Sequence, residues 1–378
     1  MSQKDNNDQT QTTEKAAEIF KPSRIILPLL IGIGVVFFLI YQNFDAQSFD
    51  RIEWRFTTLT GIIAAILLTV IRHASYVWRL RILSDKHLSW SRSFQVMSLW
   101  EFSSAITPSM VGGTVAALFL LTKEKMTFAK TTALIFATIF LDSFFFLGTT
   151  ISLWLYYGNY LISPKFVPGS NLGILDVGGW IYPFLIAFSL MISYTSFIAY
   201  GLFVNPAPIK FLLDKITKLP FLKRWNANAN EFGDELVTAS IEIKKKGWEF
   251  WLKGFFATAV SWSARFLVVV FLVNAFVGVD DFLLLYGRQL SLFLILFLTP
   301  TPGGSGVADY AFKDFYMDFI GDAGLGALIG GLWRLITYYP YLILGIMVLP
   351  TWIARVFKKE DKKPVSDKGK TSASGASS

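Results

Sequence analysis

Charged side chains inside long apolar segments are the residues of this chain that could do chemistry. Asp142, Arg265 and Arg334 stand near the middle of segments long enough to cross a membrane. A charge at that depth costs about 2.5–3.5 kcal/mol on insertion scales, so it indicates a function or a buried partner. Because a guanidinium matches a phosphate in bidentate geometry, we expect Arg265 or Arg334 to bind a lipid phosphate.

A second interpretation of the same charges is structural. Asp142 and Arg334 occupy similar places in their segments, so we also expect them to form an ion pair in which each neutralises the other. The two interpretations are compatible if the pair opens to admit a substrate. Glu101 and Arg288 stand on the entry arms of two interrupted segments, where we interpret them as interfacial charges.

Proline and glycine interrupt two of the apolar segments. The stronger interruption reads Leu298-Thr-Pro-Thr-Pro-Gly-Gly-Ser-Gly306, and the weaker reads Ile106-Thr-Pro-Ser-Met-Val-Gly-Gly113. Backbone groups freed in this way are tolerated at membrane depth only where protein or a wet cavity satisfies them. Such interruptions at matching places in two halves of a chain point to a transporter's binding site. The residues of the breaks are Pro108, Gly112, Gly113, Pro300, Pro302, Gly303, Gly304 and Gly306.

Hydroxyl groups accompany the second break. Thr299, Thr301 and Ser305 could help to hold an anionic headgroup, together with the half-helix N-termini that begin after each glycine pair. The alternative is that these hydroxyls satisfy backbone groups that proline leaves without a partner.

Composition places the chain among membrane proteins. Its 378 residues are 53% hydrophobic and 16% charged, and the apolar residues occur in runs of membrane-spanning length. Cysteine is absent, which excludes disulfides and thiol nucleophiles. The histidines are only His73 and His87, both in or beside a basic stretch, so we expect neither a metal site nor a cofactor.

The distribution of the basic residues along the chain indicates the membrane topology. It does not indicate a nucleic-acid partner. Of 35 Lys and Arg, 27 fall in the stretches 1–24, 72–93, 122–130, 205–248 and 353–378. The intervening connections 42–55, 158–177 and 278–281 hold three. This alternation follows the positive-inside rule, so both termini are expected in the cytoplasm.

The expected fold is an all-α polytopic membrane protein. About six full transmembrane helices are predicted at 25–41, 56–72, 130–157, 179–204, 249–277 and 323–352. Segment 94–121 has basic flanks and segment 282–320 has acidic flanks. Each should therefore return to its own side as a re-entrant broken hairpin, and the two hairpins should enter from opposite faces. That arrangement is an inverted repeat.

The chain divides accordingly. We expect a disordered cytoplasmic N-terminus at 1–24, a first repeat at 25–157, and an outer loop with the start of the second repeat at 158–204. An amphipathic cytoplasmic connector follows at 205–248, then the rest of the second repeat at 249–355 and a disordered tail at 356–378.

The string Thr299-Pro-Thr-Pro-Gly-Gly-Ser-Gly-Val-Ala-Asp309, with Arg334 25 residues later, resembles the lysylphosphatidylglycerol synthase transmembrane, or flippase-like, family. The resemblance covers roughly residues 25–355 and implies lipid translocation or another lipid-handling role. It assigns the motif's acidic position to Asp309, where members more often carry Glu. Thr114-Val-Ala116 stands where members commonly carry Glu or Arg. No soluble aminoacyl-transferase domain is expected.

We therefore expect a non-enzymatic inner-membrane transporter of an anionic phospholipid or lipid-linked intermediate. As a further partner we expect either a second copy of the chain, in a homo-oligomer, or a lipid-synthesising enzyme. One alternative is a scaffold or accessory subunit of a lipid-modifying enzyme. Another is an intramembrane hydrolase that uses Asp142 and Asp309 as a carboxylate pair. There is no P-loop motif, so uphill transport would need an ion gradient, the membrane potential or a partner.

Overall fold

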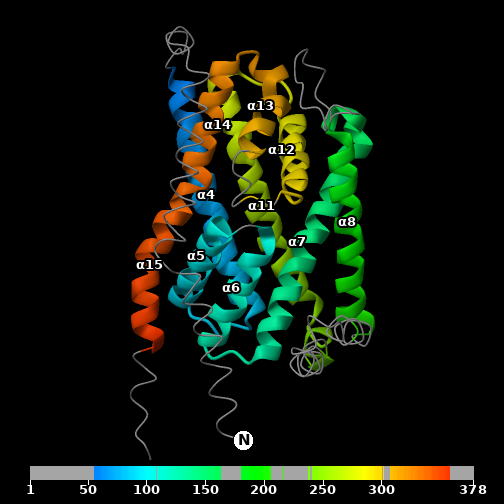
Figure 1. Cartoon of the computed structure of the whole chain (residues 1–378), viewed down its shortest axis with the longest axis vertical. Coiled ribbons are helices and arrows are strands. Elements are labelled where there is room, and N and C mark those ends of the chain that lie inside the picture. Colours follow the sequence, from blue (N-terminus) through cyan, green and yellow to red (C-terminus); the bar gives the residue numbers. More distant parts are fainter. Residues whose placement is uncertain are drawn as a thin grey trace, which may run out of the picture.

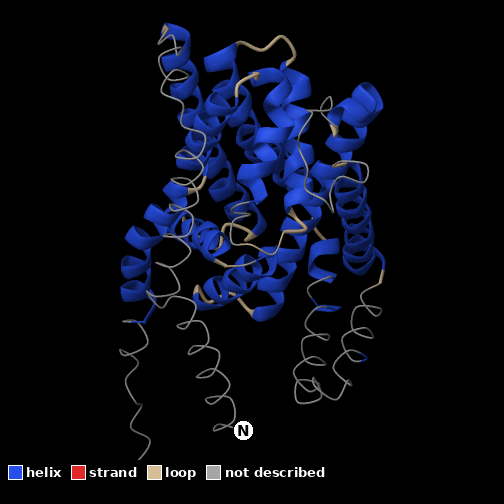
Figure 2. Ribbon diagram, turned by 45° about the horizontal axis from the view of Figure 1, so that its top comes forward, coloured by secondary structure: helices blue, strands red, loops and turns tan. Residues whose placement is uncertain are grey.

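Every regular element in the described part of the chain is a helix (Figures 1 and 2). This computed structural model describes residues 55–107, 109–162, 180–205, 215, 237–238, 241–299, 301 and 307–357, without the side chains of 109–112, 129, 309 and 357. The predicted span 25–41, both terminal segments and most of the connector 205–248 lie outside these residues. The all-helical fold class is confirmed.

Among the described residues, five helical segments are long and apolar enough to cross a membrane. They are Phe56–Leu83, Lys130–Leu161, Ile181–Val204, Trp248–Val277 and Ala323–Val356. The first is helix α4 (Phe56–Leu83), the second is mostly α7 (Phe128–Tyr157) with the short 3-10 helix η1 (Gly158–Leu161), and the third is α8 (Ile181–Ala199) with the π-helix η2 (Tyr200–Val204). The last two are α11 (Trp248–Val277) and the pair α14 (Ala323–Thr337) and α15 (Tyr339–Phe357).

Helix α4 is longer than the sequence predicts. The predicted span ends at residue 72, where a basic stretch begins, but the helix continues to Leu83. Arg72 and Arg79 are buried because carboxylates of other helices pair with them. Their charges therefore do not end the helix at the membrane surface. His73, expected in or beside a loop, is also buried in α4.

Two pairs of short helices flank the two interruptions. Helices α5 (Trp90–Ile106) and α6 (Ser109–Lys123) form the first pair, and α12 (Phe282–Leu296) and α13 (Val307–Ile320) form the second. At 1.5 Å per residue none of them reaches the ~30 Å of a hydrocarbon core. In Figure 1, α5 and α6 lie in the lower half of the molecule and α12 and α13 lie in the upper half.

Helices α4 and α11 pack along each other and form the axis of the bundle. Gly61 permits the close approach, since a Cβ atom there would lie 2.5 Å from the Cβ of Ala275. Thr58 Oγ1 donates to the carbonyl oxygen of Ala275 at 3.0 Å. Small residues and hydroxyls are the usual means of joining helices in membranes, where lipid provides no hydrophobic drive for association.

Contacts between loops and helix ends define two ends of the bundle. At one end Lys246 Nζ lies 2.5 Å from Asp85 Oδ2, and the end of α15 meets the end of α6. At the other end Tyr157 Oη donates to Asp281 Oδ1 at 2.7 Å. We call these the basic end and the acidic end. The described loops are grouped as the charge pattern predicts, and which end faces the cytoplasm stays a prediction.

Candidate functional site

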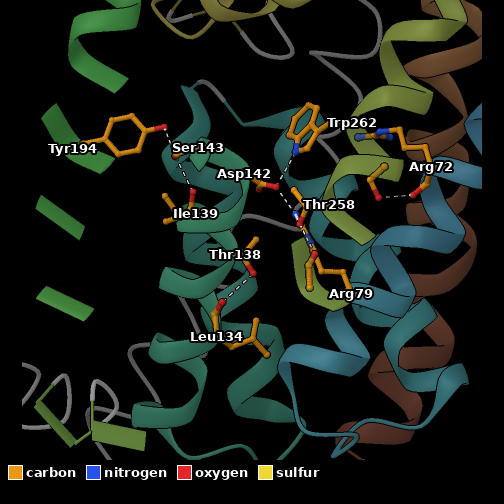
Figure 3. Close-up of polar contacts among 12 residues, drawn as sticks. Arg72, Arg79, Leu134, Thr138, Ile139, Asp142, Ser143, Tyr194, Thr258 and Trp262 are labelled. Atoms are coloured by element: carbon orange, nitrogen blue, oxygen red, sulfur yellow. Dashed lines mark hydrogen bonds and ion pairs between the residues drawn. The ribbon is translucent and has the colours of Figure 1, made fainter. Parts of the chain in front are cut away.

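Asp142 lies at the middle of α7 in a polar cluster that α4 and α11 complete (Figure 3). Arg79 of α4 forms an ion pair with Asp142 Oδ1. Trp262 Nε1 of α11 donates to the same oxygen at 2.7 Å. Arg79 Nη1 also donates to Thr258 Oγ1 at 3.2 Å. The carboxylate is therefore neutralised and hydrogen-bonded from two helices.

Arg72, seven residues before Arg79 on α4, forms a second ion pair. Its Nη2 lies 2.7 Å from Oε2 of Glu101 on α5. Its guanidinium carbon lies 4.9 Å from the ring centroid of Tyr76 and 4.7 Å from that of Tyr341. Aromatic faces around a desolvated guanidinium add to its stability. Glu101 is thus paired with a buried arginine, while its expected position at the membrane interface stays a prediction.

Arg265 lies at the middle of α11, next to these two pairs. Its guanidinium carbon is 5.5 Å from the ring centroid of Trp262 and 4.9 Å from that of Phe293. It interacts electrostatically with Arg72 and Glu101. That Arg265 lies near the middle of the membrane stays a prediction.

The charged groups of the cluster differ in exposure. The side chains of Arg72 and Arg79 are 2% and 6% exposed, whereas those of their partners Glu101 and Asp142 are 18% and 22% exposed. Arg265 is also partly exposed. The carboxylates and Arg265 are thus partly accessible, whereas the paired arginines are buried. We call Arg72, Arg79, Glu101, Asp142 and Arg265 the central cluster.

The predicted ion pair between Asp142 and Arg334 is wrong, since the cation at Asp142 is Arg79. Arg334 is buried on α14, with its guanidinium carbon 5.3 Å from the ring centroid of Trp333 and 5.5 Å from that of Tyr338. Helix α14 packs mainly on α13, α11 and α15, whereas α7 packs mainly on α8, α6 and α11. Similar positions along two segments therefore did not place these residues side by side.

The threonines beside the interruptions bond to backbone carbonyls. Thr107 Oγ1 donates to the carbonyl of Ser103 at 2.6 Å, and Thr299 Oγ1 donates to that of Leu296 at 2.7 Å. This geometry supports the interpretation that these hydroxyls satisfy the backbone. Thr301 Oγ1 is buried and finds no partner among the described residues.

Glycine at position 113 has a packing role. A Cβ atom there would lie 2.0 Å from Oγ of Ser104, so Gly113 allows α5 and α6 to approach closely. Gly112 lies in the same turn of α6. Several predicted site residues lie outside the described residues: Pro108, Pro300, Pro302, Gly303, Gly304, Ser305 and Gly306. Asp309 lies on α13, and its side chain is outside them too.

A second group of charges ties α15 to α5 and α6 at the basic end. Arg355 donates from Nη1 to Glu124 Oε2 at 2.9 Å, its Nη2 pairs with Oε1 of Glu124, and its Nε donates to Gln95 Oε1 at 3.1 Å. Trp352 Nε1 donates to Glu124 Oε1 at 3.0 Å. We call these four residues the basic-end clasp.

A comparable group ties α12 to α13 and η1 at the acidic end. Arg288 Nη1 lies 2.5 Å from Asp318 Oδ1 and donates to the carbonyl of Phe315 at 3.0 Å, while Nε donates to the carbonyl of Tyr160 at 3.2 Å. We call Arg288, Asp318 and Tyr160 the acidic-end clasp. Only 1% of the Arg288 side chain is exposed, so it is a buried, paired charge; its interfacial position stays a prediction.

Sequence reasoning missed Arg72 and Arg79 because both follow the apolar core of their segment. A usable signal was present, since Arg72, Tyr76 and Arg79 are spaced i, i+4, i+7 and so share one helix face. Among the described residues, no three His, Asp or Glu side chains gather as a metal site would require.

Comparison with known proteins places this chain in a family. No solved structure matches the chain. A protein described as "UPF0104 membrane protein" from Archaeoglobus fulgidus is 28% identical over 294 residues, which are 75% of this chain and 84% of that protein. The family described as "Lysylphosphatidylglycerol synthase TM region" matches residues 25–345. The chain is a multi-pass membrane protein that belongs to this family, as the resemblance predicted.

Proposed function

We propose that the protein transports an anionic lipid between the two leaflets of the inner membrane, with its termini in the cytoplasm. The central cluster carries this proposal. Five charged side chains lie at mid-height of a bundle of apolar helices, three of them partly exposed. Burial of that many charges is costly, and it marks a substrate path in membrane proteins.

The two helix pairs support alternating access. Gln95, Thr107, Pro108 and Glu124 of the first half match Gln289, Thr301, Pro302 and Asp318 of the second half at a constant separation of 194 positions, for example 289 minus 95. Ala133-Leu-Ile135 and Ala327-Leu-Ile329 follow the same spacing. Because the pairs lie in opposite halves of the molecule (Figure 1), the two units are interpreted as an inverted repeat with re-entrant hairpins.

In this proposal each clasp closes the access to the central cluster from one end of the bundle. Glu124 and Asp318 are equivalent in the repeat, and each ties the second helix of a hairpin to a neighbour at its own end of the bundle. Opening one clasp while the other stays closed would expose the central cluster to one side at a time. Two packings of nearly equal energy are what alternating access requires.

The test is a leaflet-exchange assay with the purified protein in liposomes. Fluorescent phosphatidylglycerol and phosphatidylcholine are incorporated, and a membrane-impermeant quencher reports the lipid that reaches the outer leaflet. We expect exchange of phosphatidylglycerol well above that in protein-free vesicles. Alanine at Arg334 or Asp309 should slow exchange of the anionic lipid more than of the zwitterionic one. No exchange of either lipid would contradict transport and favour the scaffold alternative.

A further inference from the structure

Arg265 has no direct ion-pair partner among the described residues. Its guanidinium lies against the rings of Trp262 and Phe293, and it makes no hydrogen bond or ion pair within the described part of the chain. Contacts with aromatic faces attract the positive charge of the guanidinium, but they do not provide hydrogen-bond acceptors for its N–H groups. The five N–H donors of Arg265 are therefore available to an acceptor that comes from outside the protein.

Neighbouring side chains also have polar atoms without partners. Arg72 Nε and Nη1, His73 Nδ1 and Tyr341 Oη are buried and make no hydrogen bond with the described residues. The ring centroids of His73 and Tyr341 lie 5.7 Å apart, and the ring of Tyr341 lies under Arg72. Native structures leave few buried polar atoms unpaired. Several in one place indicate a site that a polar ligand completes.

The charge balance of the central cluster fixes the sign of that ligand. Its three arginines face two carboxylates, so one positive charge is in excess. A single excess charge at mid-membrane is best neutralised by one negative charge. A phosphodiester has one such charge, and its oxygens accept from a guanidinium in bidentate geometry. A phosphate monoester would bring a second charge for which this cluster has no cation.

We propose that Arg265, with Arg72 beside it, binds the phosphate of a monoanionic phosphodiester lipid. This inference rests on the proposed lipid transport and adds the ligand class and the residues that hold it. Glu101 competes with the phosphate, because its partly exposed carboxylate already neutralises Arg72 and interacts electrostatically with Arg265. When the lipid leaves, Glu101 keeps Arg72 paired, so the empty site does not retain two uncompensated guanidinium groups.

The experiment measures lipid binding to the purified full-length protein in a non-ionic detergent. Native mass spectrometry compares phosphatidylglycerol, phosphatidic acid and diacylglycerol, which carry a phosphodiester, a phosphate monoester and no phosphate. We expect phosphatidylglycerol to bind most tightly. Arg265→Gln should weaken its binding about 10- to 100-fold, the range for losing a hydrogen bond to a charged group. Arg265→Lys should recover part of the loss.

Glu101→Gln should change the affinity for phosphatidylglycerol in the opposite direction. It removes the competing charge and keeps an oxygen that accepts from Arg72, so phosphatidylglycerol should bind severalfold more tightly. Lys253→Gln is the matched control, since it removes a positive charge from an exposed position of the same helix, α11. Its binding should equal that of the wild type.

Three results would overturn the inference: unchanged binding by Arg265→Gln, an equal loss in Lys253→Gln, or weaker binding by Glu101→Gln. If Arg265→Gln does not fold, the binding of phosphatidylglycerol by Arg265→Lys and by Glu101→Gln tests the inference without it. Leaflet exchange is measured on the same variants. Exchange that continues at the wild-type rate in Arg265→Gln would leave the proposed transport intact and refute only this binding site.

Discussion

Glu124, at the end of α6, accepts hydrogen bonds from both Nη atoms of Arg355 at the end of α15. Its side chain is 1% exposed, whereas that of Arg355 is 30% exposed. At the other end of the bundle the equivalent carboxylate, Asp318, pairs with Arg288. Each end of the bundle thus has a carboxylate–guanidinium pair, and the two pairs can be disrupted separately.

Opening the two clasps should have opposite effects on access. Glu124→Gln removes the charge that holds Arg355 and should expose the central cluster to the basic end, and Asp318→Asn should expose it to the acidic end. A single cysteine at Ser98 of this cysteine-free chain reports access, because Ser98 is fully buried beside His73. Impermeant thiol reagents applied to oriented vesicles should label each variant from a different side.

Lys246→Ala is the control for this prediction. It removes a pair at the basic end whose side chains are 31% and 60% exposed, and such exposed pairs contribute about 0–1 kcal/mol. Labelling should stay at the wild-type level. Labelling of Glu124→Gln and Asp318→Asn from the same side would contradict the assignment of the clasps as opposed closures.

Arg79 and Asp142 should be coupled in stability. Asp142→Ala leaves a buried guanidinium without its carboxylate, which typically costs about 3–5 kcal/mol. Arg79→Met in the same chain should recover much of that loss, because the uncompensated charge is gone. A double-mutant cycle by thermal or denaturant unfolding in detergent measures the coupling. The same cycle with Arg334→Met should be additive, and strong coupling there would restore the pair that the sequence suggested.

The long apolar spans could be predicted from the sequence because hydropathy and the alternation of basic loops depend on local composition. The paired charges could not be predicted in this way. Arg72 and Arg79 look like the start of a basic loop, and only the approach of Glu101 from α5 and Asp142 from α7 makes them buried. Pairing depends on tertiary packing, and equal positions along two segments do not determine which helices touch.

Topology offers an independent prediction. Cysteines introduced singly at Ser84, Lys125, Ser170 and Asp318 test the side of each loop, because the chain has no cysteine of its own. An impermeant reagent applied from outside should label only positions 170 and 318. Labelling at 125 would mean that the segment 94–121 crosses the membrane, and the inverted repeat would then be untenable.

The contact between α5 and α6 gives the last prediction. A Cβ atom at Gly113 would lie 2.0 Å from Oγ and 3.0 Å from Cβ of Ser104, so a larger residue must separate the two helices. Gly113→Leu should therefore displace the tip of the first hairpin and abolish lipid exchange, while the protein still inserts. Gly148→Leu is the matched control, because Gly148 of α7 is exposed and has no atom within 4 Å of its added Cβ.

Exchange in liposomes and the elution profile in detergent are measured for both glycine variants. Gly148→Leu should keep the wild-type exchange rate, since its side chain extends into lipid, where leucine is favourable. Gly113→Leu should elute as a monodisperse peak but show exchange near that of empty vesicles. Normal exchange by Gly113→Leu would mean that the close contact of α5 and α6 is not needed for transport, and the hairpin would lose its place in the mechanism.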